Sequence, residues 1–165
     1  MPESTPFYTA DLCDAWPDDV RVAEPVFDSF GGVGTFGGQV RTVRVFEDNV
    51  RVKETLSGAG NGDVLVVDGG GSLRVALMGG DIAVLAAGNG WSGVVIYGCV
   101  RDTHEIDAVD LGVRALASCP RKSTKRGLGE SDVPLYIAGI DINPGDYLYT
   151  DADGLIVAGR ALLES

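Results

Sequence analysis

Arg101, Asp102 and Glu105 are the residues of this 165-residue sequence whose types and spacing best fit chemistry. They directly follow the apolar run VVIYGCV, residues 94–100. A carboxylate at such a place can bind a hard divalent cation, which takes oxygen ligands and keeps several waters. A neighbouring arginine can pair with a carboxylate or stabilise a developing enolate oxygen. On spacing alone, the i, i+3 placement of Asp102 and Glu105 favours a helix-capping box, and Arg101 could simply pair with Glu105 or another carboxylate.

Gly80, Asp81, Ile82 and Ala83 form a second candidate element, preceded by another glycine at position 79. They open a predicted helix over residues 81–87. The free N–H groups and the dipole of a helix N-terminus favour an anion, and the glycines allow a ligand to approach closely. The alternative is an ordinary glycine turn before a helix that Asp81 caps. His104 is the single histidine, which argues against an imidazole-rich zinc site and against a Ser–His–Asp triad.

These residues belong to a predicted strand–helix–strand unit that spans residues 64–105. The runs VLVV (64–67) and VVIY (94–97) are short, β-branched and bounded by turn signals, which is typical of strands buried on both faces. Residues 72–78 and 81–87 are predicted to be helical. Ligands of such units gather beyond the carboxyl ends of the strands, which is where the candidate residues stand.

The flanking segments predict an α/β fold with a second β layer. Thr9 is the expected N-cap of a short helix over residues 10–15, which Pro17 ends. Further helices are predicted over 49–56 and from Asp102 to about Val109, and further strands over 39–46 and 113–117. From residue 133 onward, strands alternate with the turns NPGD and DADG, so the C-terminal third is expected to be an antiparallel β-meander.

Two further motifs do not support nucleotide binding. Gly32, Gly34 and Gly37 match GxGxxG, but a polar–apolar alternation follows them, so they open a strand where the dinucleotide fingerprint needs a helix. The only basic cluster, RKSTKR at residues 121–126, lacks the GxxxxGK[ST] spacing of a phosphate loop. The residues alone leave it open whether this cluster is a solvated loop or a ligand contact.

Composition indicates one globular domain over residues 1–165, with a loosely held N-terminus (1–8) and a short C-terminal tail (160–165). The net charge of −11 argues against direct nucleic-acid binding. Three cysteines without metal-ligand spacing, and the absence of a signal peptide, predict buried, reduced thiols and a cytoplasmic location. No apolar run approaches the roughly 20 residues of a membrane span.

The sequence resembles the family that joins regulator of ribonuclease activity A with the class II 4-hydroxy-4-methyl-2-oxoglutarate aldolases. The similarity includes ADLCDAW, FEDN, VVDGGGS, IYGCVRD, GLGESDV and PGDYLYTDADGLIV, so it covers nearly the whole chain. It also includes the pattern of the aldolase members: Gly80, twenty residues, Arg101-Asp102, two residues, then the acid Glu105. The resemblance implies a layered β/β/α fold of the swivelling type. It further implies a homotrimer, or a dimer of trimers, with sites at subunit boundaries.

The resemblance also implies roles for the candidate residues. Asp102 would hold Mg²⁺ or Mn²⁺, the amides from Gly80 to Ala83 would bind the substrate carboxylate, Arg101 would stabilise the pyruvate enolate, and Glu105 would orient metal-bound waters. The implied reaction is metal-dependent aldol cleavage of 4-hydroxy-4-methyl-2-oxoglutarate to pyruvate. Decarboxylation of oxaloacetate would be a side activity, because it passes through the same enolate.

Two other functions compete with the aldolase. Members of the same family inhibit ribonuclease E-type enzymes, and an acidic surface could dock a basic segment of such a protein. The run VLVVDGGGS resembles the first glycine-rich motif of methyltransferases, but no acidic residue ends the next predicted strand to accept the ribose hydroxyls.

Overall fold

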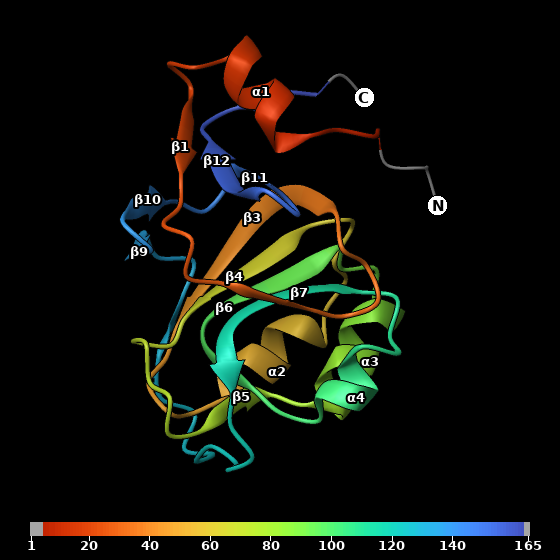
Figure 1. Cartoon of the computed structure of the whole chain (residues 1–165). Coiled ribbons are helices and arrows are strands. Elements are labelled where there is room, and N and C mark those ends of the chain that lie inside the picture. Colours follow the sequence, from red (N-terminus) through yellow and green to blue (C-terminus); the bar gives the residue numbers. More distant parts are fainter. Residues whose placement is uncertain (1–4, 164–165) are drawn as a thin grey trace.

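A mixed ten-stranded sheet forms the centre of the computed structural model, which describes residues 5–163 (Figure 1). Four parallel strands make its middle: β3 (Phe36–Arg44), β4 (Val64–Asp68), β6 (Gly93–Val100) and β7 (Gly112–Ser118). Beyond β3 the sheet continues antiparallel through β11 (Tyr147–Asp151), β12 (Gly154–Ala158) and β1 (Val20–Val22). On the other side β2 (Asp28–Phe30) pairs antiparallel with β7.

The apolar run of β4 is continuous because the strand is buried on both faces. Leu65 and Val67 pack into one core cluster, whereas Val64 and Val66 pack into another on the opposite face, and all four are fully buried. A central strand of a parallel sheet has no solvent face, so it needs no polar alternation. The predicted strands at 64–67 and 94–97 are therefore confirmed.

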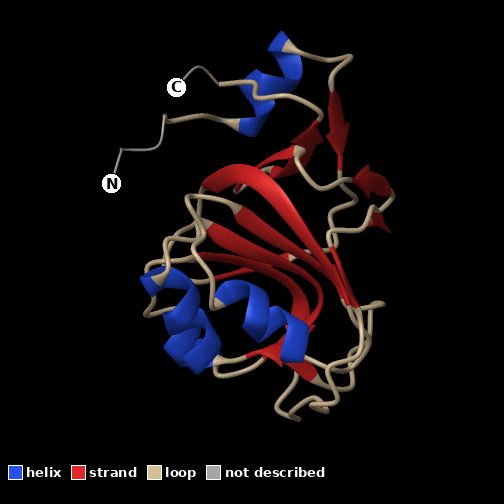
Figure 2. Ribbon diagram, turned by 180° about the vertical axis from the view of Figure 1, so that it is seen from behind, coloured by secondary structure: helices blue, strands red, loops and turns tan. Residues whose placement is uncertain are grey.

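Helices cover one face of the sheet and a small β-hairpin covers the other (Figure 2). The helical layer contains α2 (Val50–Leu56), α3 (Gly80–Gly88) and α4 (Thr103–Ile106). The hairpin on the opposite face consists of β9 (Leu135–Ile137) and β10 (Ile140–Ile142). The expected single α/β domain with a partly parallel sheet is confirmed. No helix within residues 5–163 is long and apolar enough to cross a membrane.

The helix predicted over residues 72–78 is wrong. The chain turns at Gly69–Ser72 and then forms the short strand β5 (Ala76–Met78), which pairs parallel with the end of β6. Gly70 and Gly71 have φ of 68° and 74°, a backbone conformation that permits the turn and that other residues rarely adopt. The run VALM is short and apolar, so periodicity alone cannot separate a buried strand from a helix.

Three other expectations need correction. The C-terminal strands do not form one meander, because β9–β10 is a separate two-stranded sheet and β11 pairs with β12 and β3. Helix α1 (Thr9–Ala15) begins after Tyr8, and Thr9 is not its cap: its N–H and hydroxyl donate to the Asp151 carboxylate at 2.8 and 2.6 Å. The helix after Asp102 ends at Ile106.

The structure describes part of each predicted tail and all three cysteines. Residues 1–4 and 164–165 of the two tails lie outside the described residues. Phe7, which belongs to the predicted N-terminal tail and is described, packs edge-on against Tyr149 with ring centroids 5.4 Å apart. All three cysteines are unpaired thiols, but Cys99 alone is fully buried, whereas Cys13 and Cys119 are half-buried.

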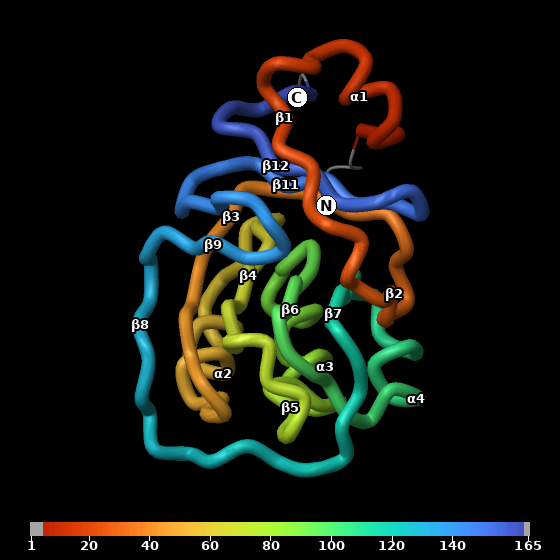
Figure 3. Tube along the Cα trace, turned by 60° about the vertical axis from the view of Figure 1, so that its left-hand side comes forward, coloured from red at the N-terminus to blue at the C-terminus, as the bar shows by residue number. Residues whose placement is uncertain are grey.

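The segment between β7 and β8 (Glu130–Ser131) carries the basic cluster around one end of the sheet to reach β3 (Figure 3). Buried Asp48 holds this segment: its carboxylate accepts the backbone N–H groups of Arg126 and Leu128 at 2.8 and 3.3 Å. Thr124 donates its N–H and its hydroxyl to the carbonyl oxygen of Glu47, both at 2.9 Å. We call residues 121–128 the basic loop.

Asp48→Asn should weaken the attachment of the basic loop. Burial raises the pKa of Asp48, but hydrogen bonds from the backbone N–H groups of Val50, Arg126 and Leu128 outweigh that effect and hold its pKa below the ordinary value. The asparagine side chain has one acceptor oxygen where the carboxylate has two, so at least one of these backbone N–H groups loses its partner. We expect the free energy of unfolding at pH 7 to fall by about 2 kcal/mol, measured by urea denaturation.

The pH dependence provides the check. Because folding lowers the pKa of Asp48, the carboxylate's contribution is complete above its unfolded-state pKa of about 3.9. It disappears as the pH falls through the lower folded-state pKa. The difference between the two proteins should therefore shrink in acid. Exposed Asp110→Asn serves as the control, and an equal loss of stability in that variant would contradict the assignment.

Candidate active site

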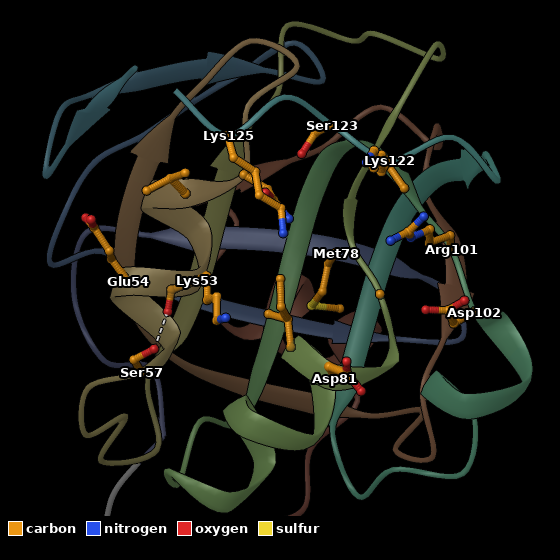
Figure 4. A pocket seen from close by; sticks show the side chains of 15 residues that line it. Lys53, Glu54, Ser57, Met78, Asp81, Arg101, Asp102, Lys122, Ser123 and Lys125 are labelled. Atoms are coloured by element: carbon orange, nitrogen blue, oxygen red, sulfur yellow. Dashed lines mark hydrogen bonds between the residues drawn. The ribbon is translucent and has the colours of Figure 1, made fainter. Parts of the chain in front are cut away.

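A cavity of about 470 Å³ lies where the first turn of α3 meets the end of β6 (Figure 4). Its volume is in the range that holds small-molecule ligands. One part of its wall consists of Gly79, Asp81, Ile82, Arg101 and Asp102. Another part comes from α2 and the basic loop, with Asn49, Lys53, Lys122, Ser123 and Lys125. Met78 lies between these parts in the close-up view.

Asp102 is held at the cavity by its backbone and by one amide. Its φ of 56° and ψ of 45° place it in the left-handed region, which bends the chain between β6 and α4. Its Oδ2 atom accepts the N–H of Gly80 at 3.1 Å. Among the described residues, its side chain makes no hydrogen bond to the first turn of α4, so the capping-box interpretation is wrong. The carboxylate reaches across to the start of α3.

The N-terminus of α3 keeps two of its amides available for an anion. The N-cap is Gly79, in extended conformation, so the alternative in which Asp81 caps the helix is wrong. The Gly80 N–H is taken by Asp102, and the Ala83 N–H donates to the carbonyl oxygen of Gly79 at 3.1 Å. The N–H groups of Asp81 and Ile82 have no acceptor within the helix, as expected for a first turn.

Glycine is required at the first turn of α3 because the chain that follows β6 packs directly on it. A methyl group at Gly79 would come within 2.6 Å of the Asp102 carboxylate. At Gly80 it would overlap the Glu105 carboxylate and approach the Cβ of that residue to 2.9 Å. The twenty residues between Gly80 and Arg101 therefore hold the rest of α3 and the whole of β6, and the residues at the two ends of this segment are in contact. Glu105 lies behind Gly80, outside the lining of the cavity in the described part of the chain.

Arg101 and His104 differ in their environment. Arg101 is half-buried, its N–H donates to the Met78 carbonyl oxygen at 2.9 Å, and its guanidinium extends toward the cavity (Figure 4). Within residues 5–163 it forms no ion pair with Glu105. The His104 side chain is 80% exposed and lies 3.7 Å from the Glu105 carboxylate, so it is in solvent and outside the cavity lining.

The structure adds residues that sequence reasoning missed. The sequence pattern gives no signal at Lys53, and it leaves open whether the basic loop is a solvated segment or a ligand contact. Lys122, Ser123 and Lys125 of that loop line the cavity. The usable signal was composition: the chain has three lysines in all, and each of them lines this one cavity although the net charge is −11.

The residues of the cavity fit a hard divalent cation that keeps much of its water. Among residues 5–163 no three His, Cys, Asp or Glu side chains are grouped to hold a metal, which argues against a closed protein cage. Mg²⁺ is commonly bound through one or two carboxylates together with waters and ligand oxygens. Asp102 supplies such a carboxylate, with Asp81 on the same side of the cavity (Figure 4).

Comparison with known proteins identifies the family of the chain. Residues 9–157 match the RraA-like family, described as Aldolase/RraA. The chain belongs to the RraA-like family. A curated relative from Pseudomonas fluorescens (strain Pf0-1), named "Putative 4-hydroxy-4-methyl-2-oxoglutarate aldolase", is 56% identical over 156 residues, which cover 94% of this chain and 96% of the relative.

Two solved structures are similar to this RraA-like chain over nearly its whole length. The RNA-processing inhibitor RraA from Thermus thermophilis has a TM-score of 0.92 at 49% identity, covering 94% of both chains. A Geobacillus kaustophilus protein described as S-adenosylmethionine:2-dimethylmenaquinone methyltransferase has a TM-score of 0.93 at 50% identity, covering 94% and 97%. Proteins similar to this chain thus carry three different functional names.

Gly80→Ala should destabilise the protein because the added methyl group displaces Glu105. We expect the free energy of unfolding to fall by about 2 kcal/mol, the usual cost of overpacking, in urea denaturation. Gly88→Ala is the matched control at the other end of α3, where the described chain leaves open space around the added methyl group. It should raise the free energy of unfolding by about 0.5 kcal/mol. Equal effects of the two substitutions would contradict the close packing at Gly80.

Proposed function

We propose that this protein is a divalent-metal-dependent aldolase that cleaves 4-hydroxy-4-methyl-2-oxoglutarate, or a related 4-hydroxy-2-oxo acid, to pyruvate. The observation that carries the proposal is the meeting of Arg101, Asp102 and the first turn of α3 at one cavity. The aldolase names of relatives that are 53–56% identical support the same reaction.

The reaction breaks the C3–C4 bond of the substrate. The hydroxyl on C4 loses its proton and becomes a carbonyl, so that C4 and its substituents leave as one pyruvate. The electron pair of the broken bond moves onto C3 and the C2 carbonyl, and gives the enolate of a second pyruvate. Protonation of this enolate at C3 completes the second pyruvate and balances the proton lost from the hydroxyl. This developing negative charge is what the protein must stabilise.

The residues of the cavity supply groups for each part of that task. The free N–H groups of Asp81 and Ile82 bind the C1 carboxylate at the positive end of α3. Arg101 places a fixed positive charge beside the C2 oxygen as the enolate forms. No lysine needs to form a Schiff base, because charge stabilisation at the C2 oxygen provides the electron sink.

Asp102 would hold the divalent cation, Mg²⁺ or Mn²⁺, with Glu105 orienting its waters from behind Gly80. When bound, the cation supplies Lewis-acid polarisation of the 2-oxo group. The same stabilised enolate forms when oxaloacetate loses CO₂, so oxaloacetate decarboxylation is the expected side activity.

Asp102→Ala should lower kcat/KM for pyruvate release from 4-hydroxy-4-methyl-2-oxoglutarate by about 1,000-fold, because the cation loses its protein carboxylate. Arg101→Met should lose about 100-fold, as expected when one charge-stabilising donor is removed. Coupled lactate dehydrogenase measures pyruvate, with and without chelator. Exposed Asp110→Ala is the control, and full activity in Asp102→Ala or in chelator would overturn the proposal.

A second candidate function is inhibition of a ribonuclease E-type enzyme by direct binding. The RNA-processing inhibitor from Thermus, 49% identical, and the net charge of −11 favour it. Binding through surface charge should weaken as salt screens it. We expect purified protein to bind the ribonuclease in calorimetry at 50 mM salt and about tenfold more weakly at 300 mM. Absence of heat at low salt would exclude this function, whatever the result for pyruvate release.

The methyltransferase alternative finds no support in the site. The glycine run after β4 leads through a turn into β5, whereas a nucleotide-binding glycine motif enters a helix. The expected homotrimer, or dimer of trimers, is a further proposal, consistent with the exposed apolar side chains of Phe46 and Leu73. Light scattering coupled to size exclusion measures it directly.

A further inference from the structure

A second cavity lies at the amino-terminal edge of the parallel strands, away from the candidate active site. Its volume of about 740 Å³ suits a small-molecule ligand. Its lining comes from the segment that joins β1 to β2, from Gly34 and Thr35 just before β3, from Arg114 on β7 and from the turn between β11 and β12. Figure 1 shows the segment from β1 to β2 crossing in front of the sheet, on the core face opposite to the helices. Among the described residues the two cavities share no lining residue, so a ligand here is separate from the proposed reaction.

Arg114 carries a positive charge into the wall of this cavity. The residue is only 5% exposed, and its guanidinium lies over the ring of buried Phe36, with 5.1 Å from Cζ to the ring centroid. Burial lowers the pKa of Arg114, and the nearby charge of Asp151 opposes that effect. An arginine side chain nevertheless stays protonated in proteins, so the charge persists in the interior.

Within residues 5–163 this buried cation forms no ion pair. Its hydrogen-bond acceptors there are all neutral: the Ser29 hydroxyl oxygen and the carbonyl oxygens of Gly34, Val113 and Asp151. Buried charges in proteins are normally paired with an opposite charge, because neutral dipoles replace the lost hydration only in part. Arg114 is therefore available to an anion that comes from outside the chain.

One edge of the guanidinium is left for such an anion. The Nη2 atom reaches the Asp151 carbonyl oxygen only at 3.5 Å, and the Nε atom makes no hydrogen bond among the described residues. The enclosed side-chain atoms without a partner belong there to Arg51 and Ser123, so the Nε atom of Arg114 has accessible surface. Nε and Nη2 form an edge of the guanidinium fork that can bind a carboxylate through two parallel hydrogen bonds.

Two exposed carboxylates, Glu24 and Asp153, also line the cavity. Neither forms an ion pair with a described residue. The third lining carboxylate, Asp151, is buried and already engaged, because it accepts the N–H and the hydroxyl of Thr9 at 2.8 and 2.6 Å. The charged side chains of the lining are therefore one buried cation and three carboxylates. Apolar residues contribute much of the remaining wall: Val22, Ala23, Pro25, Phe27 and Leu155.

The walls around Arg114 are held in place by the fold itself. Ser29 lies opposite Arg114 in the antiparallel pairing of β2 with β7, and its hydroxyl oxygen accepts the guanidinium at 3.0 Å. In the turn between β11 and β12, the Thr150 hydroxyl donates to the Gly154 carbonyl oxygen at 2.8 Å. A site that is formed in advance loses less conformational freedom when a ligand binds.

From these observations we infer that this second cavity binds a free basic amino acid, lysine or arginine. The α-carboxylate pairs with the open edge of Arg114, and the aliphatic stem lies along the apolar wall. The cationic head group pairs with the carboxylates of Glu24 and Asp153. An acid without an ammonium group is repelled by these carboxylates, and an amine without a carboxylate leaves Arg114 unpaired. A ligand with one carboxylate and a net positive charge matches both features.

The experiment uses three probes that differ by one charged group. L-lysine carries both ends, L-norleucine lacks the side-chain ammonium group, and 1,5-diaminopentane lacks the carboxylate. Calorimetric titration in about 50 mM salt limits the screening of exposed charges. Wild-type protein should bind lysine at least about tenfold more tightly than 1,5-diaminopentane, because the amine forms no charge-assisted bond to the buried guanidinium. It should bind lysine about fivefold more tightly than norleucine, since the carboxylates that meet the ammonium group are exposed.

Glu24→Gln and Asp153→Asn test the cationic end of the ligand. Each should reduce the preference for lysine over norleucine about twofold, and the double variant should abolish it. Asp28→Asn is the matched control, because it removes an exposed carboxylate next to the same crossing segment but outside the lining of the cavity. This control should keep the preference, which separates a specific site from the attraction of any cation to a chain of net charge −11.

Arg114→Met tests the carboxylate end and should abolish the preference for lysine over 1,5-diaminopentane. Because Arg114 also holds Ser29 and Gly34, circular dichroism must first show that this variant folds. The comparison of the two probes on wild-type protein tests the same contact without any substitution, so the inference stays falsifiable if the variant does not fold.

Three results would overturn the inference: a dissociation constant for lysine above about 10 mM, equal affinities for lysine and 1,5-diaminopentane, or a preference over norleucine that survives in the double variant. Pyruvate release is a separate readout. Glu24→Gln and Asp153→Asn should leave its kcat/KM unchanged, since neither residue lines the candidate active site. Failure of the aldolase proposal would therefore leave this site standing, and failure of lysine binding would leave the aldolase proposal standing.

Discussion

The contact between the first turn of α3 and the loop after β6 is the constraint on which the site depends. Asp102 accepts the Gly80 N–H at 3.1 Å, and Gly79 and Gly80 leave no room for a Cβ beside Asp102 and Glu105. This packing fixes the Asp102 carboxylate and the Arg101 guanidinium against the positive end of a helix. It also explains why the spacing from Gly80 to Glu105 carries information: both ends of the spacing are in contact.

The second organising feature is the buried carboxylate of Asp48. A carboxylate in the interior is stable only when donors satisfy it, and here the donors are backbone N–H groups of α2 and the basic loop. That arrangement holds the basic loop, which follows β7 in the chain, in the lining of the cavity. A strongly acidic protein thereby places its few lysines where an anionic ligand would gain most from them.

Much of the fold could be predicted because its signals are local. The runs in β4 and β6 are apolar throughout since both faces are buried, and α3 follows its glycines as expected. The errors fall where tertiary contacts override a short pattern. The run at 75–78 became a strand because the edge of β6 was free to pair with it, and Thr9 binds Asp151, which lies 142 residues away, and does not cap α1.

The sequence by itself determined the strand–helix–strand centre, the family resemblance and the group Gly80, Arg101, Asp102 and Glu105. It did not determine what each of these residues does, because a capping box and an open carboxylate have the same spacing. The Asp102 carboxylate decided between them, because it accepts the Gly80 N–H and, within the described residues, no N–H of the first turn of α4. Only the tertiary structure brought Lys53 of α2 and Lys125 of the basic loop to one cavity, since their meeting depends on Asp48 binding a loop almost eighty residues away.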